Sequence, residues 1–223
     1  IQVNAATFSF NSATFTNFGT LQFSTGGVLD LLNNTTTLNG NTAINGNGTI
    51  NLNGGVTRLQ FAVQIPSGVI VNFSAGIING LNSISFLTGS TMNWNGGEFQ
   101  EGAGMNINNG ASLNITNTVG IKGSSNLITN NGTITWGGTS TIQYGGGNAN
   151  SQILNNGTFN IGDASGFVET GGSNNFFYLT NAASGTINKT NGTTTLDANA
   201  FFENRGVVNI TTGVLRINSS FST

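Results

Sequence analysis

The chain has 223 residues, of which only five are Lys or Arg and seven are Asp or Glu, and its formal net charge is −2. So few basic residues leave no patch for nucleic acid, and the lack of long apolar runs and basic amphipathic helices argues against membrane insertion by this segment. The chain contains no Cys and no His, which excludes disulfides, thiol chemistry, His-ligated zinc and His-based catalytic triads.

Apolar-x-apolar triplets recur from the beginning of the chain, and the first seven follow one another at a constant interval without a slip. A fixed period of this length is typical of a solenoid, in which one short unit is stacked repeatedly and buries its apolar face against its neighbours. The triplets are Phe8-Ser9-Phe10, Leu29-Asp30-Leu31, Ile50-Asn51-Leu52, Val71-Asn72-Phe73, Met92-Asn93-Trp94, Leu113-Asn114-Ile115 and Ile134-Thr135-Trp136.

A second apolar pattern lies twelve and fourteen residues after each triplet centre. Apolar and polar positions alternate there as in the triplets, which is typical of a strand with one buried and one exposed side. Nothing repeats at helical spacing, so no helix is expected. A third strand in each coil is less regular, near Thr14–Thr16 and its equivalents. The pairs of the second pattern are Leu21/Phe23, Thr42/Ile44, Val63/Ile65, Ile84/Phe86, Met105/Ile107 and Asn126/Ile128.

A third pattern marks one corner of each coil, seventeen residues after the triplet centre. Only Gly and Asn occur at this position, and these residues adopt positive φ most readily. We therefore expect a left-handed residue to turn the chain between two strands in every coil. The corner residues are Gly26, Asn47, Gly68, Gly89, Gly110 and Asn131.

Together these patterns predict an all-β fold, a single right-handed parallel β-helix (β-solenoid) over residues 1–223 with about 21 residues per coil and roughly ten coils. The hand follows from the usual crossover preference. Stacked strands lie about 4.8 Å apart, so the rod would be on the order of 50 Å long. The triplet centres Asn51, Asn72, Asn93 and Asn114 are expected to form one column of polar side chains on its surface.

The register holds to about residue 136 and loosens over residues 137–223. The later triplets Phe159-Asn160-Ile161, Ile187-Asn188-Lys189 and Val208-Asn209-Ile210 follow at intervals of 25, 28 and 21 residues. The extra residues fall around Gly145–Ser151 and Asp163–Ser173. Insertions in a solenoid become loops on one side, which is often the binding side. The alternative is that they are tolerated surface loops without a function.

The longer insertion contains two candidate ligand-binding acids. Asp163 and Glu169 are carboxylates that would meet a sugar, and Tyr144 or Phe167 would provide an aromatic platform for stacking. A glycosidase needs two acids about 5–9.5 Å apart across such a groove. The alternative interpretation is that these are solvated charges that keep the rod soluble.

A second pair of acids, Glu98 and Glu101, is three residues apart, so alternation would place the side chains on opposite sides of a strand unless a turn intervenes. Neither pair belongs to a calcium-binding repeat, and the glycine doublets are not followed by the Lys-Ser/Thr of a phosphate loop. The sequence therefore predicts no metal, no cofactor and no enzymatic activity.

Ice binding is a further alternative, because Thr-x-Thr ladders on a solenoid suit that function. Thr14-x-Thr16 and Thr35-x-Thr37 stack in register, but Val56-x-Arg58 and Ile77-x-Asn79 interrupt the ladder in the next two coils.

Neither end of the chain has a clear polar cap over its strand edges. We expect those edges to be covered by flanking sequence of a longer protein or by neighbouring copies.

The later coils resemble the β-helical stalk repeats of exported bacterial surface proteins, the autotransporter-like and filamentous-haemagglutinin-like adhesins. The residues that carry the resemblance are Phe202–Ile210, Thr212–Ile217, Asn155–Ile161 and Ser184–Asn188. The resemblance implies a secreted, non-enzymatic rod at the cell surface that spaces, attaches or self-assembles. Its partners would be copies of itself, packed laterally or end to end, or surface glycans. A polysaccharide-binding or polysaccharide-cleaving β-helix is the alternative.

Overall fold

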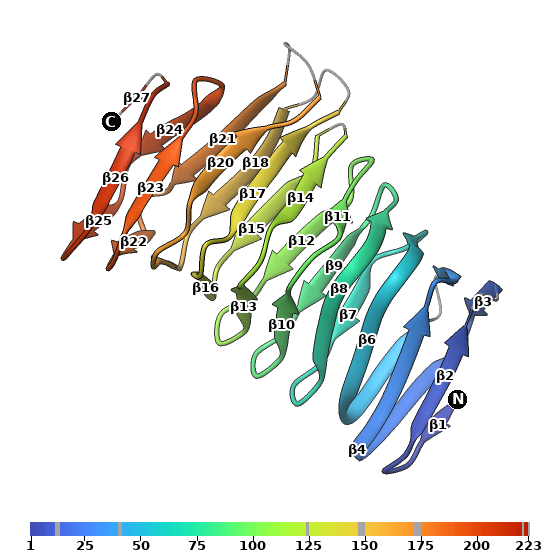
Figure 1. Ribbon diagram of the computed structural model, residues 1–223. Coiled ribbons are helices and arrows are strands. Elements are labelled where there is room, and N and C mark those ends of the chain that lie inside the picture. Colours follow the sequence, from blue (N-terminus) through green and yellow to red (C-terminus); the bar gives the residue numbers. More distant parts are fainter. Residues whose placement is uncertain are drawn as a thin grey trace.

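The computed structural model describes residues 1–11, 14–39, 42–123, 125–146, 150–171, 175–219 and 221–222. Within these ranges every regular element is a strand, and the strands of consecutive coils pair in parallel. The coils lie side by side along a rod with the two termini at opposite ends (Figure 1). The predicted all-β parallel solenoid, with coils about 21 residues apart, is confirmed.

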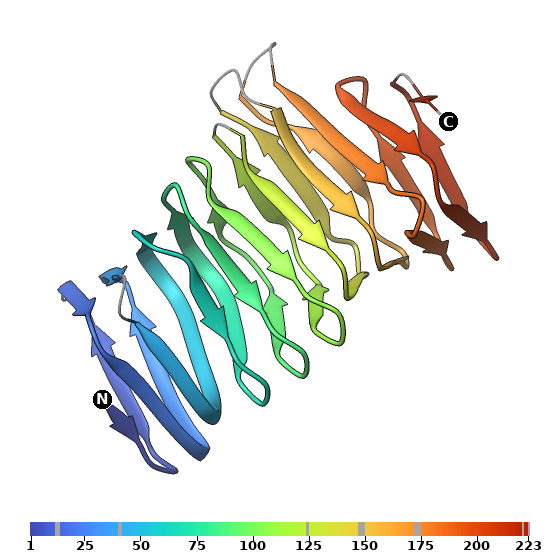
Figure 2. The same ribbon diagram turned by 180° about the vertical axis from the view of Figure 1, so that it is seen from behind.

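Each coil has three sides, which we call the first, second and third faces in chain order. The first face carries the triplets, the second carries the less regular strands, and the third carries the second apolar pattern. Three long strands bend around corners and run over more than one face: β4 (Thr20–Leu32), β6 (Ala43–Leu59) and β8 (Ile70–Asn79). The first two faces consequently belong to one 19-stranded sheet, whereas the third face forms a separate 8-stranded sheet from β7 onward. Figure 2 shows the same stack from behind.

The remaining strands are shorter and each lies on one face. Those of the first face are β2 (Thr7–Asn11), β10 (Thr91–Trp94), β13 (Ser112–Ile115), β16 (Thr133–Trp136), β19 (Thr158–Ile161), β22 (Thr186–Lys189) and β25 (Val207–Ile210). Those of the second face are β3 (Thr14–Asn17), β5 (Thr35–Leu38), β11 (Glu98–Phe99), β14 (Val119–Lys122), β17 (Thr141–Gly145), β20 (Gly166–Glu169), β23 (Thr193–Leu196) and β26 (Val214–Ile217). Those of the third face are β1 (Gln2–Val3), β7 (Val63–Ile65), β9 (Ser83–Phe86), β12 (Gly104–Ile107), β15 (Leu127–Asn130), β18 (Asn150–Asn155), β21 (Phe176–Asn181), β24 (Ala200–Asn204) and β27 (Phe221–Ser222).

The pairing register survives the change of period. Up to Trp136 the Cα partners on the first face are 21 residues apart, as in the pairing of Asn93 with Asn114. Beyond that point Thr133 pairs with Thr158, Thr158 with Thr186 and Thr186 with Val207. The inserted residues therefore leave the stack at the corners and do not disturb the strands.

A ladder of side-chain amides runs along the outside of the first face. The Nδ2 of Asn72 donates to the Oδ1 of Asn51 (2.8 Å), that of Asn93 to Asn72 (2.9 Å) and that of Asn114 to Asn93 (2.9 Å). The first amide, that of Asn51, donates to the carboxylate of Asp30 at 2.5 Å. All the amides in this run point the same way, and the predicted polar column is confirmed.

A second asparagine ladder is buried inside the rod, at the ends of the third-face strands. Asn130 donates to Asn155, Asn155 to Asn181 and Asn181 to Asn204, each at 2.7 Å. The Nδ2 of Asn155 also donates to the backbone carbonyl of Thr186 (3.2 Å). Because Asn130, Asn155 and Asn181 are fully buried, these bonds satisfy amides that water cannot reach. This ladder was not predicted from the sequence.

The interior is filled by the inward residues of all three faces. Its largest side chains are Trp94 and Trp136, which are fully buried. Trp94 packs edge-on against Phe99, with ring centroids 5.2 Å apart, and Trp136 packs against Phe167 at 4.9 Å. Burying a large apolar side chain contributes roughly 1.5–3 kcal/mol. The interior therefore drives the stacking, and the ladders fix its register.

At the corner between the third and first faces, the glycines predicted to have a left-handed backbone conformation do have it. Gly68, Gly89 and Gly110 have φ values of 80°, 81° and 78°. Their peptides also bond to one another along the rod, from the N–H of Gly68 to the carbonyl of Gly89 (3.0 Å) and from Gly89 to Gly110 (2.9 Å). One conformation thus serves both to turn the chain and to join the coils.

The same expectation was wrong for the two asparagines of that pattern, since neither Asn47 nor Asn131 has a positive φ. At Asn47, β6 continues through the corner, and Gly46 (φ 89°) takes the left-handed conformation instead. At Asn131, the corner is closed by the buried side chain of Asn130, whose Oδ1 accepts a hydrogen bond from the N–H of Gly132 at 3.2 Å.

The two ladders should differ in their effect on stability. We expect Asn155→Ala to lower the free energy of unfolding by about 2–3 kcal/mol, because it strips buried partners of their hydrogen bonds, and Asn93→Ala by less than about 1 kcal/mol, because water can replace the lost amide. Urea unfolding followed by circular dichroism measures both. Equal losses, or a larger loss for Asn93→Ala, would contradict the structural role of the inner ladder.

Candidate functional site

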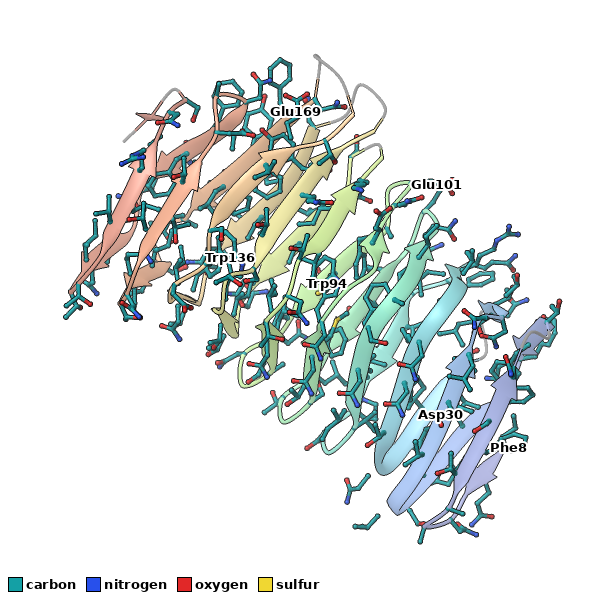
Figure 3. The ribbon with its side chains drawn as sticks, in the orientation of Figure 1. Phe8, Asp30, Trp94, Glu101, Trp136 and Glu169 are labelled. Atoms are coloured by element: carbon teal, nitrogen blue, oxygen red, sulfur yellow. The ribbon has the colours of Figure 1, made fainter. Side chains whose placement is uncertain are left out.

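The corner at which the second face turns into the third face is the most variable edge of the rod, and we call it the insertion edge. The connections from β17 to β18 and from β20 to β21 both cross it and contain part of the predicted insertions, whereas residues 166–169 of the second predicted insertion form strand β20. Of the predicted insertions, residues 147–149 and 172–173 lie outside the described residues. Figure 3 shows Glu101 and Glu169 on this edge, in coils that are three steps apart along the rod.

Charged side chains gather at the insertion edge. Arg58, Glu101, Lys122, Glu169 and Asp197 all lie in its turns or at the strand ends that lead into it. The whole chain has only five Lys or Arg and seven Asp or Glu. Five of these twelve charged residues therefore lie on one edge, which suits that edge to polar recognition.

At the C-terminal part of this edge, two carboxylates and a phenol form a carboxylate cluster around Tyr144, Glu169, Asp197 and Asn199. The hydroxyl of Tyr144 donates to Asp197 Oδ1, and the backbone N–H of Glu169 donates to Asp197 Oδ2 at 2.7 Å. The side-chain amide of Asn199 donates to Glu169 Oε2 at 2.6 Å. The cluster therefore ties together three successive coils.

The surroundings of Tyr144 hold its hydroxyl in the protonated form. Burial raises the pKa of the Tyr144 phenol above its ordinary value of 10.0, and the hydrogen bond to Asp197 and the negative charges of Asp197 and Glu169 raise it further. The phenol is thus a permanent donor at neutral pH, as the bond to Asp197 requires.

The carboxylates of the cluster are already occupied. Asp197 Oδ1 also accepts from the N–H of Asn199 (3.3 Å), and Glu169 Oε1 accepts from the amide of Asn175 (3.4 Å). Every oxygen of both carboxylates consequently has a donor within the protein. A general base or nucleophile must direct an oxygen at its substrate. The arrangement therefore favours a structural clamp over a catalytic pair.

The structure brings together some of the predicted ligand-binding residues and separates others. Tyr144 and Glu169 meet, but only through Asp197, which the sequence analysis did not single out. Asp163 is exposed at the opposite end of β20, at the corner between the first and second faces. The expectation that Asp163 and Glu169 would face one sugar together is not met, because a whole strand lies between them.

The predicted aromatic platform is also wrong. Tyr144 and Phe167 occupy inward positions of β17 and β20 and are almost completely buried. Phe167 stacks on Phe177 with ring centroids 4.6 Å apart, and Tyr144 lies 5.4 Å from the same ring. Both rings belong to the core, so neither can stack on a sugar at the surface.

Other aromatic rings do lie outside. Phe176, Tyr178 and Phe201 occupy outward positions of β21 and β24 and are partly exposed; we call them the aromatic strip. Tyr178 stacks on Phe201 with centroids 5.4 Å apart, and Phe176 lies 5.6 Å from Phe201. In the run Phe176-Phe177-Tyr178, side chains alternate between the two sides of the strand, so only the middle ring is buried. Which of the three rings points inward cannot be predicted from the sequence unless the pairing register with the neighbouring strand is known.

One cation is buried at an inward position of the first face. Lys189 is fully buried, and its ammonium donates to the backbone carbonyls of Gly162 and Asn191. Burial lowers the pKa of Lys189, and the charge of Asp163 acts in the opposite direction. Lys189 therefore caps a corner of the coil rather than facing a ligand.

The rest of the described surface provides no metal centre. Within the described ranges, no three acidic side chains converge as metal ligands, and no helix has the length and apolar character needed to cross a membrane. No protein-family model, curated protein or solved structure matches the chain.

The Tyr144–Asp197 bond predicts a specific dependence of stability on pH. Because the pKa of Tyr144 is raised in the folded state, its stabilisation is complete below about pH 10 and is lost as the pH rises further and the unfolded phenol ionises. Tyr144→Phe should therefore be destabilising at about pH 8, and the deficit should shrink by about 1.4 kcal/mol at about pH 11.

Urea midpoints of the wild type and Tyr144→Phe at the two pH values measure this change, and Tyr178→Phe is the matched control. A deficit for Tyr144→Phe that does not change with pH would show that the hydroxyl is not held in this bond.

Proposed function

We propose that the chain is a structural, non-enzymatic β-solenoid of an extracellular or cell-surface protein, a stiff rod that spaces, attaches or self-assembles. The observation that carries the proposal is the parallel pairing of consecutive coils, which is continuous on the first and second faces of the described chain and is reinforced by asparagine ladders outside and inside. Backbone hydrogen bonds between stacked strands run along the rod, so a pull along its axis is shared by every strand of a coil. Such a body suits mechanical spacing.

The outer faces support self-association. Beside the asparagine ladder of the first face, the next outward column is small, neutral and polar except for Ile70, which is 40% exposed; its members are Thr49, Ile70, Thr91, Ser112 and Thr133. With few charges of either sign, two rods repel each other little when they meet side by side. The same neutral surface also suits contact with glycan hydroxyl groups.

The end coils support stacking along the axis. Phe8 in the first coil and Ile210 in the last coil are 42% and 53% exposed, although both occupy inward positions. The equivalent side chains in the middle of the rod, such as Met92 and Trp136, are fully buried. A further coil, supplied by another copy or by more of the same protein, would bury Phe8 and Ile210 and pair the open strand edges.

Polysaccharide cleavage is the second candidate function, because the carboxylate cluster places two acids in contact with the same asparagine. The carboxylate oxygens of Glu169 and Asp197 all accept hydrogen bonds from the protein, however, which favours a structural role. Release of reducing sugar from a polysaccharide, lost in Glu169→Gln with Asp197→Asn, would favour the enzyme instead.

Assembly can be tested directly on the purified chain. At rising concentration we expect unbranched filaments one rod wide in negative-stain electron microscopy, with a matching rise in light scattering. Ile210→Lys should shorten or abolish them, because it places a charge on the inward side of the end coil, where a further coil would stack. Leu81→Lys is the control, since Leu81 is 88% exposed but lies on the insertion edge. Wild-type monomers that persist at high concentration would reject self-assembly.

A further inference from the structure

An open groove with a volume of about 580 Å³ lies on the insertion edge, at the N-terminal part of the rod. It spans three consecutive coils, at the ends of β6, β8 and β11. Its walls include Arg58, Phe61, Asn79, Leu81 and Glu101. No residue of the carboxylate cluster lines this groove, so the groove is a separate site.

Two large apolar side chains project into the groove. Phe61 is 50% exposed and Leu81 is 88% exposed, although most other large apolar residues of these coils face the interior. Asn82 donates from its side chain to the carbonyl of Gln60 at 2.7 Å, which holds the turn that presents Phe61. The groove thus has an apolar wall that the fold itself does not use.

The polar wall is built around Glu101 and Asn79. Glu101 has a φ of 56°, a left-handed conformation that is uncommon for a residue other than glycine and that clusters at functional positions. Its Oε2 accepts a hydrogen bond from Asn79 Nδ2 at 3.1 Å. The Oδ1 of Asn79 is buried without a hydrogen-bond partner among the described residues, which is costly and calls for an explanation.

The charges of the groove balance each other. Arg58 lies in the coil before Asn79 and Glu101 in the coil after it. Arg58 takes part in neither of the ion pairs that the described residues form, Lys122–Glu98 and Arg205–Glu203. An anion would be attracted by Arg58 and repelled by Glu101, and the reverse holds for a cation. A neutral ligand with many hydroxyl groups can donate to Glu101 and accept from Arg58 at once.

We propose that this groove binds a neutral glycan chain, with the apolar face of a pyranose ring on Phe61 and Leu81 and its hydroxyl groups on Arg58 and Glu101. This ligand class deepens the attachment role and so rests on the proposed function. A second copy of the chain fits less well, because the neighbouring outward residues of the third face, such as Gln64, are polar and the apolar contact would end at the groove.

Retention on an array of neutral and acidic oligosaccharides, followed by calorimetry with cellohexaose, mannohexaose and oligogalacturonate, tests the proposal. We expect the wild type to retain at least one neutral glycan. Arg58→Ala, Phe61→Ala and Glu101→Gln should each weaken that binding by about tenfold or more, which corresponds to the loss of one good contact. The matched controls, Arg216→Ala, Phe18→Ala and Glu203→Gln, should not change it, and circular dichroism verifies folding of each variant.

Retention of no glycan, retention of only the uronate, or unchanged binding in all three groove variants would each overturn the proposal. Loss in Tyr178→Ala instead would move the site to the aromatic strip and would equally overturn the groove. Electron microscopy of the same preparations separates this failure from that of the rod, because filaments that form without glycan binding leave the structural proposal intact.

Discussion

Backbone pairing between one coil and the next is the interaction on which the rest of this molecule depends. Since each strand pairs in parallel with its equivalent, a residue type repeated at one position becomes a column along the rod. Columns of apolar residues become a continuous core. A column of asparagines becomes a chain of amide hydrogen bonds, as from Asn114 to Asp30. The residue type at one position of the repeat therefore determines the character of a whole column, either on the surface or in the interior.

The same constraint explains where the rod can vary. A residue inserted into a strand would move every following side chain to the opposite side. Extra residues are consequently confined to corners, and the connections that vary most in length cross the insertion edge, where five of the twelve charged residues also lie. The edge holds a saturated carboxylate cluster around Asp197 at one end and an open groove around Phe61 at the other. Among the described residues of this edge, the groove has exposed apolar side chains and an unpartnered polar atom, Asn79 Oδ1.

Prediction from sequence succeeded where the repeat is regular and failed where it is not. The triplets and the second apolar pattern predicted the faces and the outer asparagine column, because a constant period makes the inward positions unambiguous. Tyr144 and Phe167 were predicted to lie on the surface because the repeat is no longer regular in that part of the chain. An error of one residue in the strand register exchanges the buried and the exposed side chains. Asp197 is 53 residues from Tyr144, so their bond could not be expected before the offsets of the intervening coils were known. The groove is formed by turns of three coils, whose residues share no pattern.

The stacking of coils in register can be tested most directly by engineered disulfides, because the chain has no native Cys. Asn72 and Asn93 are Cα partners on adjacent strands, and strands about 4.8 Å apart fall within the range of about 4.4–6.8 Å that a disulfide spans. We predict that Asn72→Cys with Asn93→Cys closes a bond on mild oxidation with an unchanged circular dichroism spectrum. Asn72→Cys with Asn114→Cys, two coils apart, should remain reduced. Failure of the first pair, or equally ready closure of the second, would contradict the stacked solenoid.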